Sequence, residues 1–385
     1  MDEQQKSLPK LILRRVLRTL ALAAILALVF HLIFAEKNIY WQEPDVGFYS
    51  MSTRVEFRFY TPDKKSVAPA AHLVQQSFRD INKMCNRFDP ESELSRLNAT
   101  AYREPFVCSA ELWAILMKAK KMYELSDGGF DVTVTPFIEL WRAKGRKSVP
   151  APEELAAAKK RVGLDKILFD EKAKTVRFTV EGMSVDLGGI AKGAALDLCV
   201  ERAEKTRLVG TENAKDVPFM KVAEAWYLKK LVTLNRGYIN AGGNVIVLSE
   251  PPPEKEFYSI GVRNPAGGPP CAYVDILDAC VSTSGNYERF VEFDGKRYGH
   301  ILDPRTGMPV ENMISVSVVA ESGIDADALS TAIYVRGIDF AEKMKSQYPG
   351  LRVLIFYTDK NEPEKVRHHT IGDWRDIVPP VLKSK

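Results

Sequence analysis

Hairpins are interspersed with single helices along this chain, and this arrangement constrains its fold more than any other feature. Residues 166–180 contain two short strands, ILF and VRFTV, around the polar turn EKAK. A second hairpin is predicted to turn at Asp294-Gly295, between RFVEF and KRYGHIL. No regular strand–helix–strand alternation connects these units, so the pattern predicts the α+β class.

Hydrophobic periodicity places further elements around these hairpins. In residues 51–60 (MSTRVEFRFY) apolar and charged side chains alternate, as in a half-buried strand. Ser109 is a plausible N-cap of a helix that stops near Gly128-Gly129. The remaining predictions are a helix over 70–88, a strand over 314–320, a helix capped by Asp325 and stopped at Gly337, and a strand over 351–357.

The domain organisation follows from length and composition. The chain has 385 residues, of which 45% are hydrophobic, so it is neither disordered nor collagen-like. After residue 36 it has no low-complexity stretch and no clear repeat. The predicted parts are a basic segment (1–18), an apolar span (19–35), a connector (36–50), one domain (51–375) with a polar, patternless insertion (206–236), and a tail (376–385).

The N-terminal segment predicts a membrane anchor. Residues 1–18 contribute +3 of the net charge of +4, which leaves the rest about neutral and without a nucleic-acid footprint. The uncharged run 19–35 would span roughly 25 Å as a helix, near the lower limit for a bilayer. We therefore expect a single-pass signal anchor in the inner membrane, with a cytoplasmic N-terminus and a periplasmic body. A cleaved signal peptide and a buried core helix are the alternatives.

Cysteine usage gives no metal or redox motif. The five cysteines form no CxxC pair, and none follows the apolar run as a lipid acceptor. An odd number leaves at least one thiol unpaired within the chain, and no pairing can be assigned.

Two glycine-rich segments could approach a ligand. In DGGFDVTVTPF (127–137) the two glycines permit close backbone approach, although the segment taken alone favours a helix C-cap followed by a strand. VDLGGIAKGAALD (185–197) predicts a strand, a Gly-Gly turn and a helix beginning near Ile190, with Lys192 in its first turn. Amides at a helix N-terminus beside a lysine suit a phosphate, but a tight strand-to-helix connection needs no ligand.

Two further segments carry polar chemistry. Ser282, Thr283 and Ser284 form a predicted hydroxyl-rich turn, and His300 and Asp303 follow in YGHILDPRTGMPV (298–310). A histidine beside hydroxyls and carboxylates is a site candidate, whereas Asp303 with Arg305 could simply cap a loop. In DADALSTA (325–332), Asp327 and Thr331 share one helix face and are oxygen ligands suited to Mg²⁺. Ordinary helix capping is the alternative there.

Taken together and in this order, these segments resemble the FAD:protein FMN transferase family, the ApbE-like flavinyltransferases. The matching stretches lie between residue 51 and about residue 345: NRFDPESELSRLN, GGFDVTVTPFIELW, VDLGGIAKG, INAGGN, STSGNYER, HILDPRTGMPV and DADALSTA. The resemblance implies a single ApbE-like, T-fold-related α+β domain of mixed sheets flanked by helices. It also implies an Mg²⁺-dependent transferase that moves FMN from FAD to a threonine hydroxyl of an extracytoplasmic target protein and releases AMP.

The resemblance also implies residue roles. Mg²⁺ would lie between the Gly189 carbonyl, Asp327 and Thr331, and Lys192 would stabilise charge on the pyrophosphate. His300 or Asp303 would orient or deprotonate the acceptor hydroxyl. Contacts with FAD would come from Met51, Phe88, Gly129, Phe130, Asp131, Lys192 and Ile301.

The sequence departs from the family pattern at three positions. Ser52 stands where these proteins usually have glycine, which could crowd the approach of FAD. Asn244 and Asn286 each replace a common aspartate, which keeps size and hydrogen bonding but removes charge. None of the three is a predicted metal ligand, so the enzyme interpretation stands.

Other activities use the same residues. An Mg²⁺-dependent FAD pyrophosphatase would transfer FMN to water, and a flavin-binding protein or a scaffold of a membrane redox complex would carry out no transfer. The expected partners are FAD, an acceptor protein that is membrane-associated or extracytoplasmic, and the membrane itself.

Overall fold

The computed structural model describes most of the chain, which forms two compact units. The units are Met1–Trp41 and Gln42–Lys385. In the first, residues 18–26 are helical, while residues 27–35 of the predicted anchor lie outside the described residues. In the described part of the chain, no helix is both long and apolar enough to cross a membrane. The described residues are 16, 18–26, 41–42, 46–61, 67–205, 234–286, 289–359 and 361–381, so most of the predicted insertion also lies outside them.

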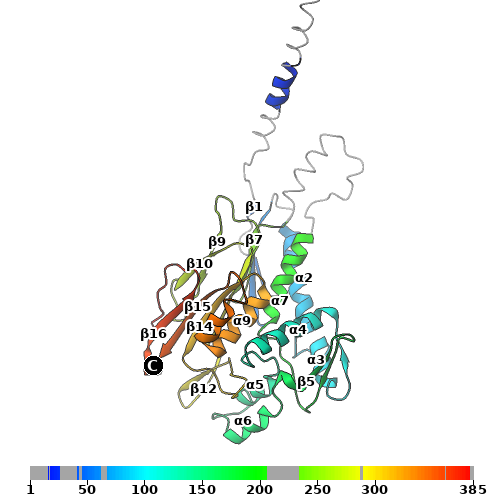
Figure 1. The fold of residues 1–385 in the computed structure, drawn as a ribbon, viewed down its shortest axis with the longest axis vertical. Coiled ribbons are helices and arrows are strands. Elements are labelled where there is room, and N and C mark those ends of the chain that lie inside the picture. The colour runs from blue at the N-terminus through cyan, green and yellow to red at the C-terminus, as the bar shows by residue number, and fades with distance from the viewer. Residues whose placement is uncertain are drawn as a thin grey trace, which may run out of the picture. The chain divides into compact units, whose positions relative to one another are not determined.

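A nine-stranded sheet forms the centre of the second unit in its described residues (Figure 1). The strand order is β1-β3-β7-β8-β11-β14-β15-β16, with β2 paired to β3, and every pair of known register is antiparallel. The strands are β1 (Trp41–Gln42), β2 (Val46–Ser50), β3 (Thr53–Thr61), β7 (Gly237–Ala241), β8 (Asn244–Val247), β11 (Ala279–Gly285), β14 (Met313–Ala320), β15 (Arg352–Asp359) and β16 (Glu362–Ile371).

Both faces of the central strands are covered, which explains why nearly all of β14 and residues 353–356 of β15 are buried. One face packs against helices, and Val316 and Val318 of β14 belong to that core. On the other face, Leu354 and Phe356 of β15 pack against the hairpin of β9 (Tyr258–Val262) and β10 (Ala272–Ile276). Two smaller sheets pair β12 (Phe290–Phe293) with β13 (Lys296–Gly299), and β4 (Phe106–Val107) with β6 (Thr175–Phe178) and β5 (Ile167–Asp170).

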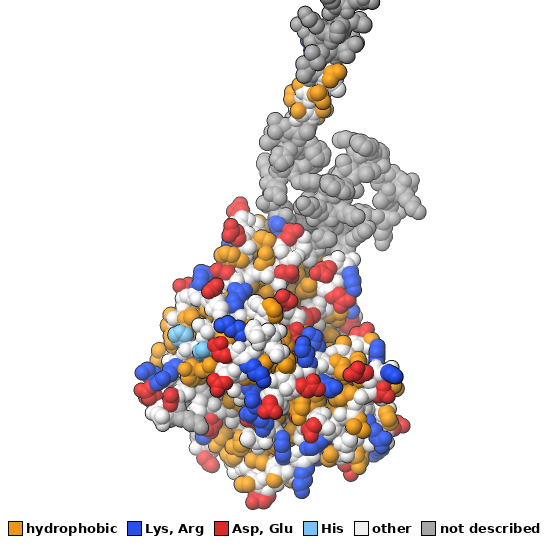
Figure 2. All heavy atoms as spheres, in the orientation of Figure 1, with side chains coloured by type: hydrophobic (Ala, Val, Ile, Leu, Met, Phe, Trp, Pro, Cys, Tyr) orange, Lys and Arg blue, Asp and Glu red, His pale blue; other side chains and the backbone are white. Residues whose placement is uncertain are grey.

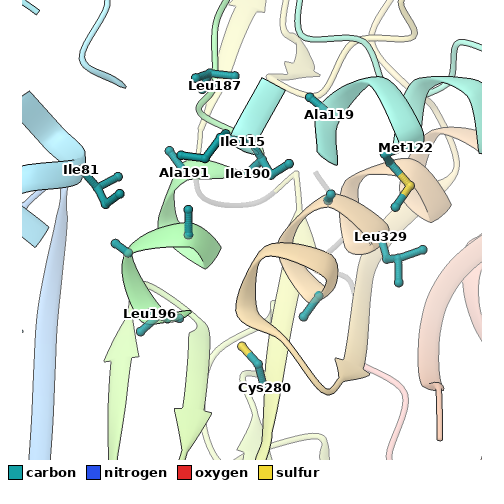
Figure 3. Close-up of a cluster of buried hydrophobic side chains, with 14 of the residues drawn as sticks. Ile81, Ile115, Ala119, Met122, Leu187, Ile190, Ala191, Leu196, Cys280 and Leu329 are labelled. Atoms are coloured by element: carbon teal, nitrogen blue, oxygen red, sulfur yellow. The ribbon is translucent and has the colours of Figure 1, made fainter. Parts of the chain in front are cut away.

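The helical layer places two helices next to each other on the sheet. Helices α7 and α9 pack together, and α9 also packs on β11 and β14. Figure 3 shows Ile190, Ala191 and Leu196 of the α7 region and Leu329 of α9 in one apolar cluster, with Cys280 of β11 beneath them. The helices are α2 (Val67–Cys85), α3 (Glu93–Thr100), α4 (Ala110–Leu125), α5 (Thr135–Trp141), α6 (Pro152–Lys159), α7 (Ala191–Lys205), α9 (Gly323–Arg336) and α10 (Ile338–Met344).

The structure confirms the predicted hairpins and the Ser109 N-cap but corrects four local predictions. Residues 185–187 belong to no strand, and the strand expected after Gly129 is replaced by turns and then α5. The predicted hydroxyl-rich turn at 282–284 is part of strand β11. Helix α9 begins at Gly323 with Ser322 as its N-cap, because the Ser322 hydroxyl accepts a hydrogen bond from the Asp325 amide; the predicted cap, Asp325, lies inside the helix.

Two tight turns meet at one end of the sheet. The β2–β3 turn is Met51-Ser52, with φ of 50° and 59°, and the β7–β8 turn is Gly242-Gly243, with φ of 61° and 93°. Positive φ at both central residues is the type I′ geometry that suits two-residue hairpins. A side chain on Gly242 would lie 2.1 Å from the Thr53 hydroxyl, so the turns are in direct contact. The glycine that the resemblance implies at position 52 would therefore suit the left-handed backbone of this turn, and not only the space needed by a ligand.

The surface carries no extended patch of one charge on the face seen in Figure 2, where Lys/Arg and Asp/Glu side chains are intermingled. This agrees with the nearly neutral composition of the chain after residue 18.

Candidate active site

The first turn of α7 meets the carboxylate of Asp327 from α9. The Lys192 ammonium lies 3.3 Å from Asp327 Oδ1 and 3.5 Å from Oδ2. The Gly193 amide donates to Asp327 Oδ2 at 3.0 Å. Only 3% of Asp327 is exposed, so its charge is held by an ammonium and by the positive end of a helix instead of by water.

Close packing of the two helices brings these groups together. A side-chain carbon on Gly193 would lie 2.1 Å from the Gly323 carbonyl oxygen, and one on Gly323 would lie 2.6 Å from the Gly193 carbonyl oxygen. The two backbones therefore touch, and any larger residue at either position would separate α7 from α9.

A hydroxyl network lies beside Asp327. Thr331, one turn further along α9, is 3.2 Å from the Ser284 hydroxyl and 3.4 Å from the Asp327 carbonyl. The Ser330 hydroxyl donates to the same carbonyl at 2.9 Å and contacts the Ser284 hydroxyl at 2.9 Å. These contacts fix the Thr331 hydroxyl on the side of α9 that faces Gly189.

The network ends in a buried amide. Ser282 donates to Asn244 Oδ1 at 2.7 Å and lies 3.3 Å from the Ser330 hydroxyl. Asn244 is 1% exposed, and its Nδ2 has no hydrogen-bond partner among the described residues. The aspartate that the resemblance implies for this position would have no donor to satisfy, so the expectation that asparagine keeps the hydrogen bonding is wrong here: the Nδ2 donor is new and unpaired among the described residues.

The three predicted metal ligands come together. A side-chain carbon on Gly189 would lie 3.7 Å from the Thr331 hydroxyl and 3.3 Å from the Phe130 ring, and Asp327 is one turn from Thr331. A carboxylate, a hydroxyl and a carbonyl are hard oxygen donors, which fits Mg²⁺ that completes its shell with water and phosphate oxygens. Within the described residues, no group of three or more His, Cys, Asp or Glu side chains could hold a metal ion.

The GGFD segment forms a wall of the region. Asp131 is 7% exposed and accepts hydrogen bonds from the amide and hydroxyl of Thr133 at 2.8 Å and 2.6 Å. Burial raises the pKa of Asp131, and the hydrogen bonds from Thr133 oppose the rise. A polar cavity of about 210 Å³ lies against this segment, and it is lined by Tyr123, Glu124, Asp127, Gly128, Asp131, Lys159 and Arg305.

Phe88 offers an exposed ring next to the Gly188-Gly189 turn. The ring is 77% exposed, and the Arg87 guanidinium lies over it at 4.3 Å. Arg87 Nε pairs with Asp186 Oδ2 at 2.7 Å, and Asp186 Oδ1 accepts from the Gly188 amide at 2.7 Å. Arg87 and Asp186 thus link the aromatic ring to the Gly188-Gly189 turn that precedes α7.

His300 follows β13, and its tautomer can be deduced. Its Nδ1 lies 3.1 Å from the Arg289 carbonyl oxygen, which also accepts from the His300 amide at 3.2 Å. Because a carbonyl can only accept, Nδ1 carries the proton and Nε2 keeps its lone pair. The Arg289 guanidinium donates to the Ser52 carbonyl at 3.1 Å, so this residue links His300 to the turn that contains Met51.

The surroundings of His300 keep it uncharged. Burial lowers the pKa of His300 to about 4; the hydrogen bond to Arg289 opposes this, and the cations Arg289, Arg142 and Lys192 lower it further. A small crevice of about 20 Å³ is lined by His300 and Arg142 among other residues. A neutral imidazole with a free Nε2 is a proton acceptor at neutral pH.

Asp303 is engaged elsewhere. Its two oxygens accept from Arg305 Nε at 2.8 Å and from an Arg305 terminal nitrogen at 2.6 Å, and the Arg305 amide also donates to it at 2.9 Å. Burial raises the pKa of Asp303, but these bonds from Arg305 outweigh burial and lower it. The capped-loop interpretation therefore describes Asp303. Ile301, a predicted FAD contact, is partly buried and packs against the main core.

Several residues of the region carried no signal in the sequence. Arg142 lies just outside the GGFDVTVTPFIELW stretch, and Arg289 is the last residue of STSGNYER but was given no role there; both act on His300 only through the fold. Ser330 could have been suspected from the DADALSTA segment, but its partners on β11 are 46 and 48 residues away.

Comparison with known proteins places this geometry in a family. The model of the ApbE family matches residues 51–211 and 220–355. The FAD:protein FMN transferase of Treponema pallidum (strain Nichols) is 32% identical over 304 residues, covering 75% of this chain and 76% of that protein. The enzyme of the same name from Haemophilus influenzae is 30% identical over 297 residues, covering 74% and 78%.

Solved structures agree. The crystal structure of the ApbE protein from Thermotoga maritima superimposes with a TM-score of 0.67 at 29% identity, covering 85% of this chain and 96% of that chain. The flavin transferase ApbE from Vibrio cholerae gives a TM-score of 0.65 at 22% identity, covering 86% and 97%, and this likeness concerns the fold.

Proposed function

The chain belongs to the ApbE family, and on that premise we propose that it is an Mg²⁺-dependent transferase that moves FMN from FAD to a threonine hydroxyl of a target protein. That it is an enzyme, a flavin transferase, follows from its relatives, which are named FAD:protein FMN transferases. The metal, the threonine and the extracytoplasmic location are the proposed parts.

One observation carries the proposal. The carboxylate of Asp327, a residue of α9, lies against the first turn of α7 beside Lys192, and Thr331 is one turn further along α9. Buried carboxylates are costly unless paired, and here the partner is an ammonium that can also bind phosphate. Phosphoryl-group transfer requires positioning and neutralisation of charge more than covalent chemistry. Bound between Gly189, Asp327 and Thr331, Mg²⁺ would supply that neutralisation at the pyrophosphate.

The residues of the chain divide the remaining work. Lys192 binds the diphosphate, with the α7 amides behind it, and Phe88, Met51, Phe130, Gly129, Asp131 and Ile301 surround the rest of FAD. The acceptor oxygen forms a bond to the phosphorus of the FMN half while the bond to the AMP oxygen breaks. The proton of the acceptor hydroxyl passes to His300 Nε2, which the Arg289 carbonyl keeps free. Between the two predicted bases we favour His300, because Asp303 is neutralised by Arg305.

The proposed location rests on the N-terminal sequence. Five basic residues precede the uncharged run 19–35, which supports a cytoplasmic N-terminus and a tethered body on the extracytoplasmic side. The target is then a membrane-associated or extracytoplasmic protein.

The test uses the full-length chain with FAD, Mg²⁺ and a protein that carries a flavinylation threonine. In-gel flavin fluorescence on the acceptor together with released AMP, both lost with EDTA, is the expected result. FMN and AMP without a labelled acceptor would identify a pyrophosphatase, and bound FAD without products would identify a binding protein.

A pair of variants tests the metal assignment. Asp327→Ala should abolish transfer in a folded protein, whereas Asp325→Ala, on the same helix but paired with Lys118 at 3.0 Å, should retain it. Undiminished transfer by Asp327→Ala would refute the assignment.

A further inference from the structure

Asp197, the last residue of the VDLGGIAKGAALD segment, binds the start of α9 from the middle of α7. Its Oδ1 accepts from the Gly323 amide at 2.5 Å, and its Oδ2 accepts from the Ile324 amide at 2.9 Å. Both donors belong to the first turn of α9, where helical amides have no partner within the helix. The carboxylate therefore connects two helices that are 126 residues apart in the chain.

The connection is reciprocal. Asp197 of α7 accepts from the first turn of α9, and Asp327 of α9 accepts from the first turn of α7 through the Gly193 amide. Between these two carboxylates the backbones touch at Gly193 and Gly323. The two helices are thus hydrogen-bonded to each other on both sides of a close backbone contact.

Asp197 and Ser322 pair different amides at the start of α9. The Ser322 hydroxyl accepts from the Asp325 amide and donates to the Asp325 carboxylate. Asp197 accepts from the Gly323 and Ile324 amides, the two that precede it. Because Asp197 belongs to α7, its bonds join the two helices as well as completing the cap of α9.

The charge of Asp197 is kept at an energetic cost. Burial raises the pKa of Asp197 to about 6, the two amides lower it, Asp325 raises it and Lys118 lowers it. Cys199 and Cys280 also face this carboxylate. Because the folded pKa lies above the ordinary value near 3.9, folding favours the protonated form, so stability falls as the pH rises from about 4 to about 6 and stays lower above that range. A group that costs stability at neutral pH is a candidate for function.

We propose that Asp197 is a positioning residue for the Mg²⁺ site, holding α9 against α7 so that Asp327 and Thr331 stay opposite Gly189. The inference rests on the proposed function, since it concerns the site assigned there. A carboxylate that turns toward a metal gives up part of its bonding to Lys192 and Gly193. The bonds from Asp197 then keep the first turn of α9 in place, and they do so without touching the metal ligands.

The test compares Mg²⁺ binding by the full-length wild type, Asp197→Asn, Asp325→Asn and Asp327→Ala. Mg²⁺ alone is titrated at pH 7.5, and its dissociation constant is measured by calorimetry and by the rise in melting temperature. Asp197→Asn keeps the size of the side chain but loses the charge and one acceptor. We expect it to melt near the wild-type temperature, because the lost hydrogen bond is offset by the lost buried charge.

The expected result is a dissociation constant at least about 10-fold higher in Asp197→Asn, the range typical of residues that orient metal ligands. Asp325→Asn removes a carboxylate from the first turn of α9 without touching α7. Its dissociation constant for Mg²⁺ should stay within about twofold of the wild-type value. A merely structural role would move the melting temperature and leave the dissociation constant unchanged. An unchanged dissociation constant in folded Asp197→Asn overturns the proposal.

Two controls separate this inference from the proposed function. If the wild type binds Mg²⁺ and Asp327→Ala does not, the site is established whatever Asp197→Asn shows; a wild type that binds no Mg²⁺ overturns both proposals. Should Asp197→Asn not fold, Asp197→Glu replaces it. Its extra methylene keeps the charge but moves the carboxylate relative to the Gly323 and Ile324 amides, so a wild-type Mg²⁺ affinity in folded Asp197→Glu would overturn the inference.

Discussion

Acidification of the assay tests the role given to His300. The proposed step needs an unprotonated Nε2, so activity must fall as the imidazole takes up a proton. An ordinary histidine with a pKa near 6.5 would be protonated over the range from pH 7.5 to pH 5.5. Burial and the neighbouring cations lower the pKa of His300 to about 4, so the fall should come at a much lower pH.

The difference is large enough to measure. At pH 5.5, a base with a pKa of 4 is about 97% neutral, whereas one with a pKa of 6.5 is about 9% neutral. Transfer at pH 5.5 should therefore stay close to its value at pH 7.5, instead of falling roughly tenfold. Arg142→Gln removes a nearby cation, so it should raise the pKa of His300 and move the acidic limb to higher pH.

The assay measures kcat for acceptor labelling between pH 5 and pH 8, with FAD and acceptor saturating. Mg²⁺ is also kept saturating. A change in Mg²⁺ affinity caused by the titration of Asp197 then does not affect kcat. His300→Gln is the control and should lose most of the activity. A wild-type limb centred near pH 6.5, or full activity in His300→Gln, would refute the reasoning.

Three further outcomes follow from the structure. Ser52→Gly relieves a left-handed residue in the β2–β3 turn and should raise the free energy of unfolding by roughly 1 kcal/mol in urea denaturation; an unchanged midpoint would contradict the turn geometry. Gly193→Ala places a carbon 2.1 Å from the Gly323 carbonyl oxygen and should destabilise the fold by about 3 kcal/mol, seen as a clear drop in melting temperature; a wild-type melting curve would argue against the helix contact. All five cysteines are free and buried, and burial raises the pKa of Cys85 and Cys108 to about 12, so a thiol reagent at pH 8 should label fewer than one thiol per native chain and five after denaturation.

Local patterns in the sequence predicted the elements whose signals are themselves local. The Asp294-Gly295 hairpin, the Ser109 cap and the end of α9 at Gly337 depend on residues within a few positions, and all three are confirmed. The strand expected after Gly129 is wrong because Asp131 binds the Thr133 amide and helix α5 begins at Thr135 with Pro136 in its first turn, and these local features outweigh the β-branched run. The predicted start of α9 is wrong because Ser322, three residues before Asp325, is the N-cap and accepts from the Asp325 amide.

Parts of the candidate site depend on tertiary packing and could not be predicted from the sequence. The spacing of Asp327 and Thr331 indicated a shared helix face, and the structure has them one turn apart. That Lys192 pairs with Asp327 depends on how α7 crosses α9, which no periodicity encodes. The arginines near His300 are likewise brought there by the chain path, and residue spacing gives no sign of them.

The ion pair of Lys192 and Asp327 has a consequence for the newly made chain. The two residues are 135 positions apart, so at roughly 5–20 residues per second Asp327 is synthesised about 7–27 s after Lys192. During that interval the apolar side of α7, with Ile190 and Leu196, has no α9 to cover it. Contacts between such distant residues form late in folding. The nascent protein must therefore keep this surface from aggregating until synthesis has passed residue 336, and the site is complete only when nearly the whole chain has been made.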